Sequence, residues 1–317
     1  ILGLLVDSKK EIKIIGDKSL SKRDFSRVTE PLKFFGANLI SENNRLPVKI
    51  KGSNFLRPIK YEEKLGSAQC KSAVMLAALK TPGITKIKAR KSRNHTEIFF
   101  KNLKVPTKIK KTKNNDLIEV KGLHNFKAFN YRIPGDISSC SFFIVLTTLT
   151  SNSSLTIQKI NTNNTRIGII RILKKMNANI QFVNKKNYKN EPIADIKIKS
   201  TKNLRAINCP KSFNSSAIDE FLLIFLIAAR AKGVSKFYDL KELNNKESPR
   251  LNIAIKFLRN IGIKVDIENF NIKIHGNPKL SLNGDYIIKD FMKDHRVFMM
   301  SCIAALTLGG NWYIHDT

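Results

Sequence analysis

Cysteine is scarce in this 317-residue chain, and its spacing excludes the usual uses of clustered thiols. The four cysteines, Cys70, Cys140, Cys209 and Cys302, lie far apart along the chain. Such spacing provides neither a CxxC pair nor a cluster typical of a zinc site. Three of them lie in or beside apolar runs, so we interpret the cysteines as buried thiols of a protein that works in the reducing cytoplasm.

Long apolar runs are absent as well. The longest, from Phe221 to Ala229, is bounded by Glu220 and Arg230 and is too short to cross a bilayer. The chain begins at Ile1 without a Met or a basic segment, which is not typical of a signal peptide. Because it also ends at Thr317 directly after a strand-like run, we expect an internal fragment of a longer protein.

Acidic residues are few, because 25 Asp and Glu stand against 57 Lys and Arg, for a net charge of +32. Such an excess is typical of nucleic-acid-binding proteins. The 43 lysines, however, are spread over the whole chain and far outnumber the 14 arginines. The single Trp and the apolar surroundings of most Phe residues also disfavour base stacking. A basic nucleic-acid-binding repeat protein stays open as an alternative to an enzyme acting on small anionic substrates.

A repeated order of elements is the strongest pattern that is present. An apolar helix and a short strand are followed by an amphipathic helix and two strands, the last of which ends in Gly or Ser. The apolar helices are expected at 73–79, 141–149, 220–231 and 296–308. The amphipathic helices are expected at 25–35, 96–103, 166–176 and 249–261. The closing strands end at Gly52, Gly122, Ser200 and Gly276, which are 70 to 78 residues apart.

This regularity predicts an α/β protein made of βαβαββ-like units, each too small to bury its own apolar faces. The turn at Pro134 and Gly135, after a long polar stretch, is the clearest boundary in the chain. We therefore expect two domains, residues 1–133 and residues 134–317.

The polar loops before the helices hold the unusual side chains, and helix N-termini favour anions. Ser67 opens one such helix and is equally well explained as an ordinary N-cap. Lys71 in the same first turn opposes the helix dipole, which predicts an anion beside it. In the next loop, Asn94 or Thr96 together with Glu97 fits a capping box.

Three further loops combine charges before helices, at 219–220, 246–250 and 294–296. Acids at a helix start are ordinary, but charges packed against a buried helix cost free energy unless they meet partners. Arg23, Arg250 and Arg296 come from such loops in separate copies, and converging guanidinium groups would suit a phosphorylated carboxylic acid. The chain has no Walker-type loop, HExxH, GxSxG or dinucleotide fingerprint, and we expect neither a metal nor a cofactor.

Taken together, these segments resemble the EPSP synthase (3-phosphoshikimate 1-carboxyvinyltransferase) family. Five segments match in the family's order, and they cover nearly the whole chain. They are Leu-Pro through Gly at 46–52 with Ser-Ala-Gln-Cys-Lys-Ser-Ala-Val at 67–74, Ser-Arg-Asn-His-Thr-Glu at 92–97, Pro-Gly-Asp-Ile-Ser-Ser at 134–139, Lys-Glu-Ser-Pro-Arg at 246–250, and Asp-His-Arg at 294–296. The resemblance implies two inside-out α/β barrel domains of repeated βαβαββ units, incomplete here at both ends.

The resemblance also implies a monomeric cytoplasmic transferase of aromatic amino acid biosynthesis, which moves the enolpyruvyl group of phosphoenolpyruvate to shikimate 3-phosphate. It implies no role for nucleic acid, membrane or metal. Three residues would be catalytic, namely Asp219, Lys246 and Glu247. Shikimate 3-phosphate would be bound by Ser67, Ala68, Gln69, Ser92, Arg93, Asp219 and Lys246. Phosphoenolpyruvate would be bound by Arg23, Gln69, Arg250 and Arg296.

Several departures from the family pattern are visible. Two substrate loops expected before Ile1 and a Lys-bearing segment expected beyond Thr317 are absent, which implies that this chain alone is inactive. Lys293 stands where the family usually has Gly, and Pro249 stands where an acid is common. The nearest rival, the sister transferase that acts on UDP-N-acetylglucosamine, would require a reactive Cys in a Pro-Gly-Gly-Cys-like loop, and no cysteine has that context.

Overall fold

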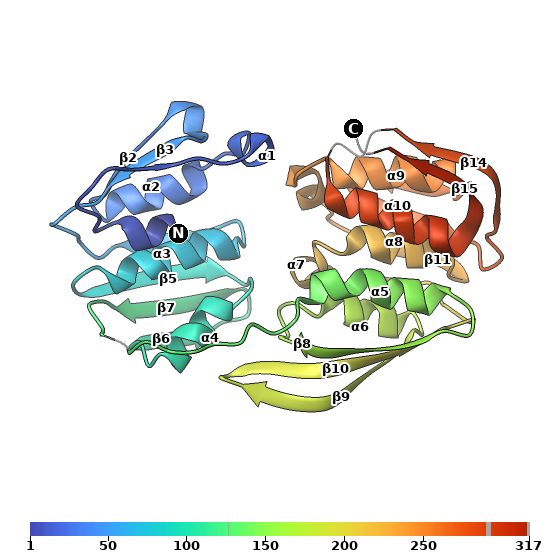
Figure 1. Cartoon of the computed structure of the whole chain (residues 1–317), viewed down its shortest axis with the longest axis horizontal. Coiled ribbons are helices and arrows are strands. Elements are labelled where there is room, and N and C mark those ends of the chain that lie inside the picture. The colour runs from blue at the N-terminus through green and yellow to red at the C-terminus, as the bar shows by residue number, and fades with distance from the viewer. Residues whose placement is uncertain (126, 290–292, 316–317) are drawn as a thin grey trace. The chain divides into compact units, whose positions relative to one another are not determined.

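The computed structural model describes residues 1–125, 127–289 and 293–315, and the chain divides into two compact units, Ile1–Tyr131 and Arg132–Thr317 (Figure 1). The last residue, Thr317, lies outside the described residues. The division falls close to the turn at Pro134 and Gly135. Each unit has its own hydrophobic core, so each is described by itself.

The first unit contains two antiparallel or mixed sheets with helices between their strands. Its helices are α1 (Lys18–Ser21), α2 (Ser26–Phe34), α3 (Ala68–Leu79) and α4 (His95–Asn102). The strands β1 (Ile12–Ile14), β3 (Val48–Lys51) and β2 (Asn38–Ser41) form one sheet in the order β1-β3-β2. The other sheet has the order β4-β5-β7-β6, with β4 (Lys60–Glu63), β5 (Ile84–Arg90), β7 (Asn115–Lys121) and β6 (Thr107–Lys111).

The second unit repeats this organisation with longer strands. Its helices are α5 (Ile137–Leu149), α6 (Gly168–Lys175), α7 (Asn214–Ala217), α8 (Phe221–Ala229), α9 (Arg250–Asn260) and α10 (His295–Leu308). The sheet β8-β10-β9 is formed by β8 (Ser154–Asn161), β10 (Glu191–Lys199) and β9 (Asn179–Tyr188). The sheet β11-β13-β12 is formed by β11 (Gly233–Phe237), β13 (Asn271–Gly276) and β12 (Val265–Glu268). A parallel pair joins β14 (Leu282–Ile288) and β15 (Gly309–Ile314).

Apolar helices occupy the interior of the second unit and the sheets cover them. Every residue of α8 is buried. The helices α5, α8 and α10 contact one another, and Figure 1 shows where they lie in the second unit. A helix that is apolar on all sides is stable only when protein surrounds it. Among the described residues no single helix is long and apolar enough to cross a membrane, and only the sharply bent pair Lys211–Ala217 and Phe221–Ala229 reaches that length and composition jointly.

The strands present one face to these helices and one to solvent. In β5 and β7 of the first unit, buried and exposed residues alternate along the strand, which is typical of a sheet packed on one side only. α3 lies against both strands and against α2. The predicted α/β architecture, with apolar helices inside and strands outside, is confirmed.

Two details of the repeat differ from the prediction. α3 and α5 begin earlier than expected because Ser67 and Asp136 act as N-caps, accepting hydrogen bonds from the backbone N–H groups of Cys70 and Ser139. In two copies an opening strand was also missed: β4 precedes α3 and pairs with β5 in parallel, and β14 precedes α10 and pairs with β15 in parallel. Their periodicity in the sequence is weak, because β4 has only four residues and β14 contains Gly284 and Asp285.

The glycines that close the repeats are required by close approach of two backbones. At Gly122, a Cβ atom would overlap the carbonyl oxygens of Ala78 and Thr81 at the end of α3. At Gly276, it would overlap the carbonyl oxygens of Ala228 and Ala231 at the end of α8. The closing strand of each of these copies therefore lies directly against the C-terminal end of its central helix.

We expect Gly122→Ala to destabilise the first unit, because backbone carbonyl groups cannot move aside as a flexible side chain can. The free energy of unfolding should fall by about 2 kcal/mol or more, the range of overpacked interiors. Ser200→Ala at the equivalent closing position is the control, and it should change the free energy by less than about 0.5 kcal/mol. Urea denaturation of both variants checks this, and equal effects would refute the close-approach explanation.

Candidate functional site

The Asp219 carboxylate contacts cationic side chains from two other segments of the second unit. It lies between α7 and α8. Lys246 Nζ and Arg250 Nη1 each lie 3.6 Å from its Oδ1 atom. Arg166 Nη1 lies 3.9 Å from its Oδ2 atom. The structure therefore brings Lys246 and Arg250 to the same carboxylate, and it adds Arg166, which was not among the predicted site residues.

Arg250 and Asp294 form the buried part of this arrangement, with side-chain exposures of 1% and 0%. Arg250 Nε donates to Asp294 Oδ2 at 2.8 Å, and Nη2 donates to Oδ1 at 3.2 Å, which is a bidentate ion pair. Asp294 also accepts hydrogen bonds from Ser248 Oγ at 2.7 Å and from the backbone N–H of Arg296 at 3.0 Å. Burying both charges costs several kcal/mol per ion unless hydrogen bonds satisfy them in this way.

Because Asp294 is the N-cap of α10 and Arg250 is the first residue of α9, their ion pair fixes the N-terminal ends of both helices. Glu247 also contacts Nη2 of Arg250. The predicted acid, Glu247, and one predicted phosphoenolpyruvate ligand, Arg250, are therefore in direct contact.

A second group of contacts joins the N-terminal ends of α5, α8 and α10. Arg166 Nη2 donates to Ser138 Oγ at 2.6 Å, and Ser138 Oγ donates to Glu220 Oε1. Arg296 Nη1 donates to the backbone carbonyl of Asp219 at 3.1 Å and lies 3.8 Å from Glu220 Oε1. Arg296 is thus placed beside Asp219 by the main chain rather than by its carboxylate.

Sequence reasoning assigned no function to several residues that support this arrangement. Arg166 also pairs with Asp136, at 2.8 Å between Nη2 and Oδ1. Asp136 and Ser138 belong to the Pro-Gly-Asp-Ile-Ser-Ser segment, which served only as a family marker, and Arg166 occupies the same pre-helical position as Arg93. We refer to the whole group as the charged cluster, which consists of Asp136, Arg166, Asp219, Glu220, Lys246, Glu247, Arg250, Asp294 and Arg296.

The two buried carboxyl groups of the charged cluster have pKa values displaced in opposite directions. Burial raises the pKa of Asp294, but the hydrogen bonds from Arg250 and Ser248 and the charge of Arg250 outweigh it, so the pKa lies below its usual range. Burial also raises the pKa of Glu220, and here it dominates, because the Ser138 hydroxyl lowers the pKa only in part and the Asp219 charge raises it further. The number of donors at each carboxyl group explains the difference.

Lys293 shows why a glycine is usual at its position. Its φ is 55°, in the left-handed region that favours glycine, and it directly precedes the N-cap Asp294. A residue with a side chain in this region carries strain of about 1 kcal/mol or more. The buried bonds of Asp294 hold the backbone in this conformation.

The first unit holds the other predicted ligands at two neighbouring helix starts. Ser67 is the N-cap of α3, and its Oγ accepts from Cys70 N at 3.3 Å, so the structural interpretation of this serine is confirmed. Ala68 and Gln69 are the first residues of α3. Ser92 and Arg93 lie in the loop between β5 and α4. Ser92 Oγ is buried and makes no hydrogen bond to the described part of the chain, so a ligand atom would satisfy it.

The capping box predicted at residues 94–97 is wrong. Asn94 is the residue before α4, but its side chain makes no hydrogen bond that caps the helix. Thr96 Oγ1 lies 2.6 Å from Ser72 Oγ, and Glu97 Oε1 lies 2.6 Å from Lys71 Nζ. The anion predicted beside Lys71 is therefore Glu97 and not a substrate. Thr96 and Glu97 therefore contact side chains of α3 instead of the N–H groups at the start of their own helix.

Arg23 lies in the loop between α1 and α2, where its backbone N–H donates to the carbonyl of Leu20 at 3.1 Å. The residues predicted to bind shikimate 3-phosphate come from both units, and so do those predicted to bind phosphoenolpyruvate. Of the predicted site residues, the structure joins Asp219, Lys246, Glu247, Arg250 and Arg296 in one charged cluster.

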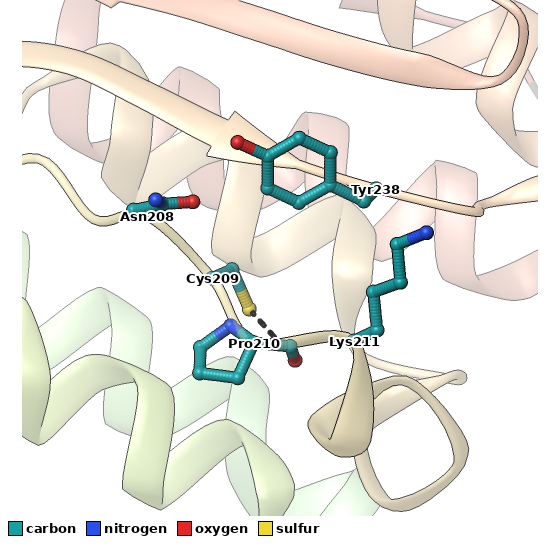
Figure 2. Close-up of a pocket in the computed structure, with 5 residues that line it drawn as sticks. All are labelled: Asn208, Cys209, Pro210, Lys211 and Tyr238. Carbon is teal, nitrogen blue, oxygen red and sulfur yellow. Dashed lines mark hydrogen bonds between the residues drawn. The ribbon is translucent and has the colours of Figure 1, made fainter.

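A separate pocket of about 580 Å³ opens in the second unit and is lined by Asn208, Cys209, Pro210, Lys211 and Tyr238 (Figure 2). None of the predicted site residues lines it. Burial raises the pKa of the Cys209 thiol to about 11, so it is a weak nucleophile at neutral pH. Within the described residues, no group of three or more His, Cys, Asp or Glu side chains could hold a metal ion.

Comparison with known proteins decides the family. The family model for EPSP synthase (3-phosphoshikimate 1-carboxyvinyltransferase) matches residues 1–317. The chain belongs to the EPSP synthase family. The 3-phosphoshikimate 1-carboxyvinyltransferase of Endomicrobium trichonymphae is 36% identical over 316 residues, which cover 99% of this chain and 72% of that protein. The enzyme of the same name from Ruthia magnifica is 39% identical over 96% of this chain and 69% of that protein.

Solved structures agree with this assignment. EPSP synthase from Acinetobacter baumannii superposes with a TM-score of 0.85 at 33% identity, over 99% of this chain and 71% of that one. The enolpyruvyl transferase NikO from Streptomyces tendae has a TM-score of 0.71 at 14% identity over 99% of this chain and 70% of that one, which shows a shared fold. The predicted EPSP synthase-like fold is confirmed.

We expect Asp294→Asn to lower the free energy of unfolding at neutral pH by roughly 3 kcal/mol, because it breaks a buried ion pair. The lowered pKa of Asp294 stabilises the folded chain above the ordinary pKa of Asp, and this contribution disappears as the pH falls through the folded value. The difference between the unmodified chain and Asp294→Asn should therefore shrink on acidification. Urea denaturation at a series of pH values measures it.

Glu220→Gln should affect the pH dependence of the free energy of unfolding in the opposite sense to Asp294→Asn. With its raised pKa, Glu220 keeps its proton in the folded chain at pH values where the unfolded chain has lost it, so stability falls as the pH rises through that window. The glutamine should remove this fall and leave the chain relatively more stable at the alkaline end. Parallel pH dependence for Asp294→Asn and Glu220→Gln would show that the two carboxyl environments are not distinct.

Proposed function

We propose that the protein containing this chain transfers the enolpyruvyl group of phosphoenolpyruvate to the 5-hydroxyl of shikimate 3-phosphate and releases phosphate. Membership of the EPSP synthase family and relatives named 3-phosphoshikimate 1-carboxyvinyltransferase support the reaction. The observation that carries the site is the charged cluster, because it gathers Asp219, Lys246, Glu247, Arg250 and Arg296.

The proposed chemistry assigns one role to each group. Glu247 gives a proton to the methylene carbon of phosphoenolpyruvate, which makes the adjacent carbon electrophilic. The 5-hydroxyl of shikimate 3-phosphate adds to that carbon and gives its proton to Asp219, assisted by Lys246. The tetrahedral intermediate then loses a proton from its methyl group and expels phosphate, which restores the double bond. Arg250 and Arg296 stabilise the charge of the phosphoenolpyruvate groups throughout.

Binding of phosphoenolpyruvate to Arg250 requires a local rearrangement. Only 1% of the Arg250 side chain is exposed, and its guanidinium already contacts Glu247 and Asp294. Glu247 is 25% exposed and can turn towards solvent, whereas Asp294 is fully enclosed. We propose that the substrate carboxylate displaces Glu247 from Arg250, which would also free Glu247 to act as the acid.

Shikimate 3-phosphate is proposed to lie at the starts of α3 and α4. Ser67, Ala68 and Gln69 begin a 12-residue helix, whose N-terminal N–H groups and dipole favour a phosphate. Ser92 offers a buried hydroxyl, and Arg93 lies beside it in the same loop. Arg23 and Gln69 are proposed as further phosphoenolpyruvate ligands.

The sister reaction on UDP-N-acetylglucosamine is less well supported. That reading requires a reactive cysteine, and a reactive cysteine requires a thiolate. Burial raises the pKa of each of the four thiols, to about 12 for Cys140 and about 11 for Cys209.

The free state of all four cysteines supports our proposal of a cytoplasmic location. The family resemblance is the basis for proposing a monomer without nucleic-acid partners.

We expect Glu247→Gln and Asp219→Ala each to lower turnover by roughly 10²-fold or more, as is typical when a general acid or base is lost. Glu242→Gln is the matched control, because Glu242 is an exposed acid a few residues away, and it should keep normal turnover. The assay measures phosphate release from phosphoenolpyruvate by the full-length protein, with and without shikimate 3-phosphate. Release that does not depend on shikimate 3-phosphate, or near-normal rates for both variants, would contradict these roles.

A further inference from the structure

Lys71 and Glu97 form a buried ion pair in the first unit, and neither side chain has a role in the proposed reaction. Their exposures are 0% and 5%, and Lys71 Nζ lies 2.6 Å from Glu97 Oε1. Lys71 is in the first turn of α3, and Glu97 is in the first turn of α4. The neighbouring residues, Ser72 and Thr96, form a second polar contact at 2.6 Å. The two helix starts are therefore joined at consecutive positions.

Stability does not explain this ion pair. Desolvating both charges costs several kcal/mol per ion, and apolar residues of similar volume in place of a buried pair are often neutral or stabilising. Moreover, Glu97 Oε2 is buried and has no hydrogen-bond partner in the described part of the chain, which adds a further cost. Lys71 also stands at the positive end of the α3 dipole, where a cation is unfavourable.

A third contact connects the pair to the backbone of a ligand loop. Lys71 Nζ donates to the carbonyl oxygen of Arg93 at 2.9 Å. That carbonyl belongs to the loop between β5 and α4, which also carries Ser92. The helix that carries Lys71 itself begins with Ala68 and Gln69. One ammonium group thus joins the two backbone segments that hold the proposed shikimate 3-phosphate ligands of this unit.

We infer that the Lys71–Glu97 pair is a positioning device for shikimate 3-phosphate: Glu97 orients the ammonium group of Lys71, and this group holds the Arg93 carbonyl so that Ser92 and Arg93 face the ligand at the start of α3. The inference rests on the proposed function, since that function supplies the identity of the ligand. It makes the affinity for shikimate 3-phosphate, and not that for phosphoenolpyruvate, depend on two side chains that touch neither substrate.

The central test compares Lys71→Met with the double variant Lys71→Met/Glu97→Leu, both made in the full-length protein. Lys71→Met leaves Glu97 as an uncompensated buried charge, so it should lose thermal stability, whereas the apolar double variant should recover it. Both lack the donor to Arg93, so both should show a KM for shikimate 3-phosphate raised roughly tenfold, with the KM for phosphoenolpyruvate within about twofold of normal. A purely structural pair predicts instead that KM recovers together with stability.

Two further variants serve as controls. Glu97→Gln keeps the donor of Lys71 and offers it an amide oxygen, so it should lose stability but keep a nearly normal KM for shikimate 3-phosphate. Lys80→Met removes another lysine of the same helix region, whose ion pair with Asp7 is exposed at 44% and 41%, and it should change neither property.

Native-state hydrogen exchange separates this inference from the proposed function, because it needs no substrate. The backbone N–H groups of residues 91–94 should exchange faster in Lys71→Met and in the double variant, with those of α3 in the double variant unchanged. Unchanged exchange at 91–94, or a normal KM for shikimate 3-phosphate in the double variant, would overturn the inference. An unmodified protein that releases no phosphate would overturn the proposed function instead, while faster exchange in the variants would still support the positioning of the loop.

Discussion

The constraint on which this structure depends is the enclosure of helices that are apolar on every side. α8 is buried along its whole length, and α5 and α10 pack against it inside the second unit. Charged groups are absent from the middle of these three helices and gather instead at the helix starts, where unpaired N–H groups require acceptors. Asp136, Asp219 and Asp294 directly precede or closely precede α5, α8 and α10. The position of the charged cluster follows from the way the core is built.

Each unit adds a buried ion pair that ties a central helix to its amphipathic neighbour. In the first unit, Lys71 of α3 meets Glu97 of α4. In the second, Asp294 at the start of α10 meets Arg250 at the start of α9. The signs are reversed, but the mechanical consequence is the same, because a pair held away from water allows little change in the angle or register between two helix starts. Such pairs contribute little net stability, and their value lies in fixing one arrangement of the loops.

Periodicity revealed the repeat because burial acts over whole helices, and a helix such as α8 is apolar at every position. Helix starts were less predictable, since the polar first turn of α3 looks like a loop until Ser67 is seen to cap it. The capping box at residues 94–97 failed for a related reason. Glu97 had an attractive local partner in the sequence, but folding brought Lys71 within 2.6 Å of it. Contacts between residues 26 positions apart leave no local signal.

The same limit applies to the charged cluster. The charges before helices marked the loops at 219–220, 246–250 and 294–296, and the family resemblance suggested roles for their residues. Their proximity was not predictable, because it comes from three loops that folding brings together. Arg166 and Ser138 carried no motif of their own that marked them as partners, and only the folded chain shows that they connect Asp136 to Glu220. A lysine at 293 was recognisable as unusual, yet the reason, a positive φ, is a property of the folded backbone.

The net charge of +32 does not arise in the charged cluster. The charged cluster contains four cationic and five acidic residues, so its cations are already compensated by its own carboxylates. Attraction of an anionic substrate therefore cannot come from an uncompensated positive field at these residues. We propose that it comes from exchange, in which a substrate carboxylate or phosphate replaces a protein carboxylate on a guanidinium group that is already oriented. An arginine held on one side by Asp294 and on the other by the more exposed Glu247 is built for such an exchange, since one partner is fixed and the other can leave.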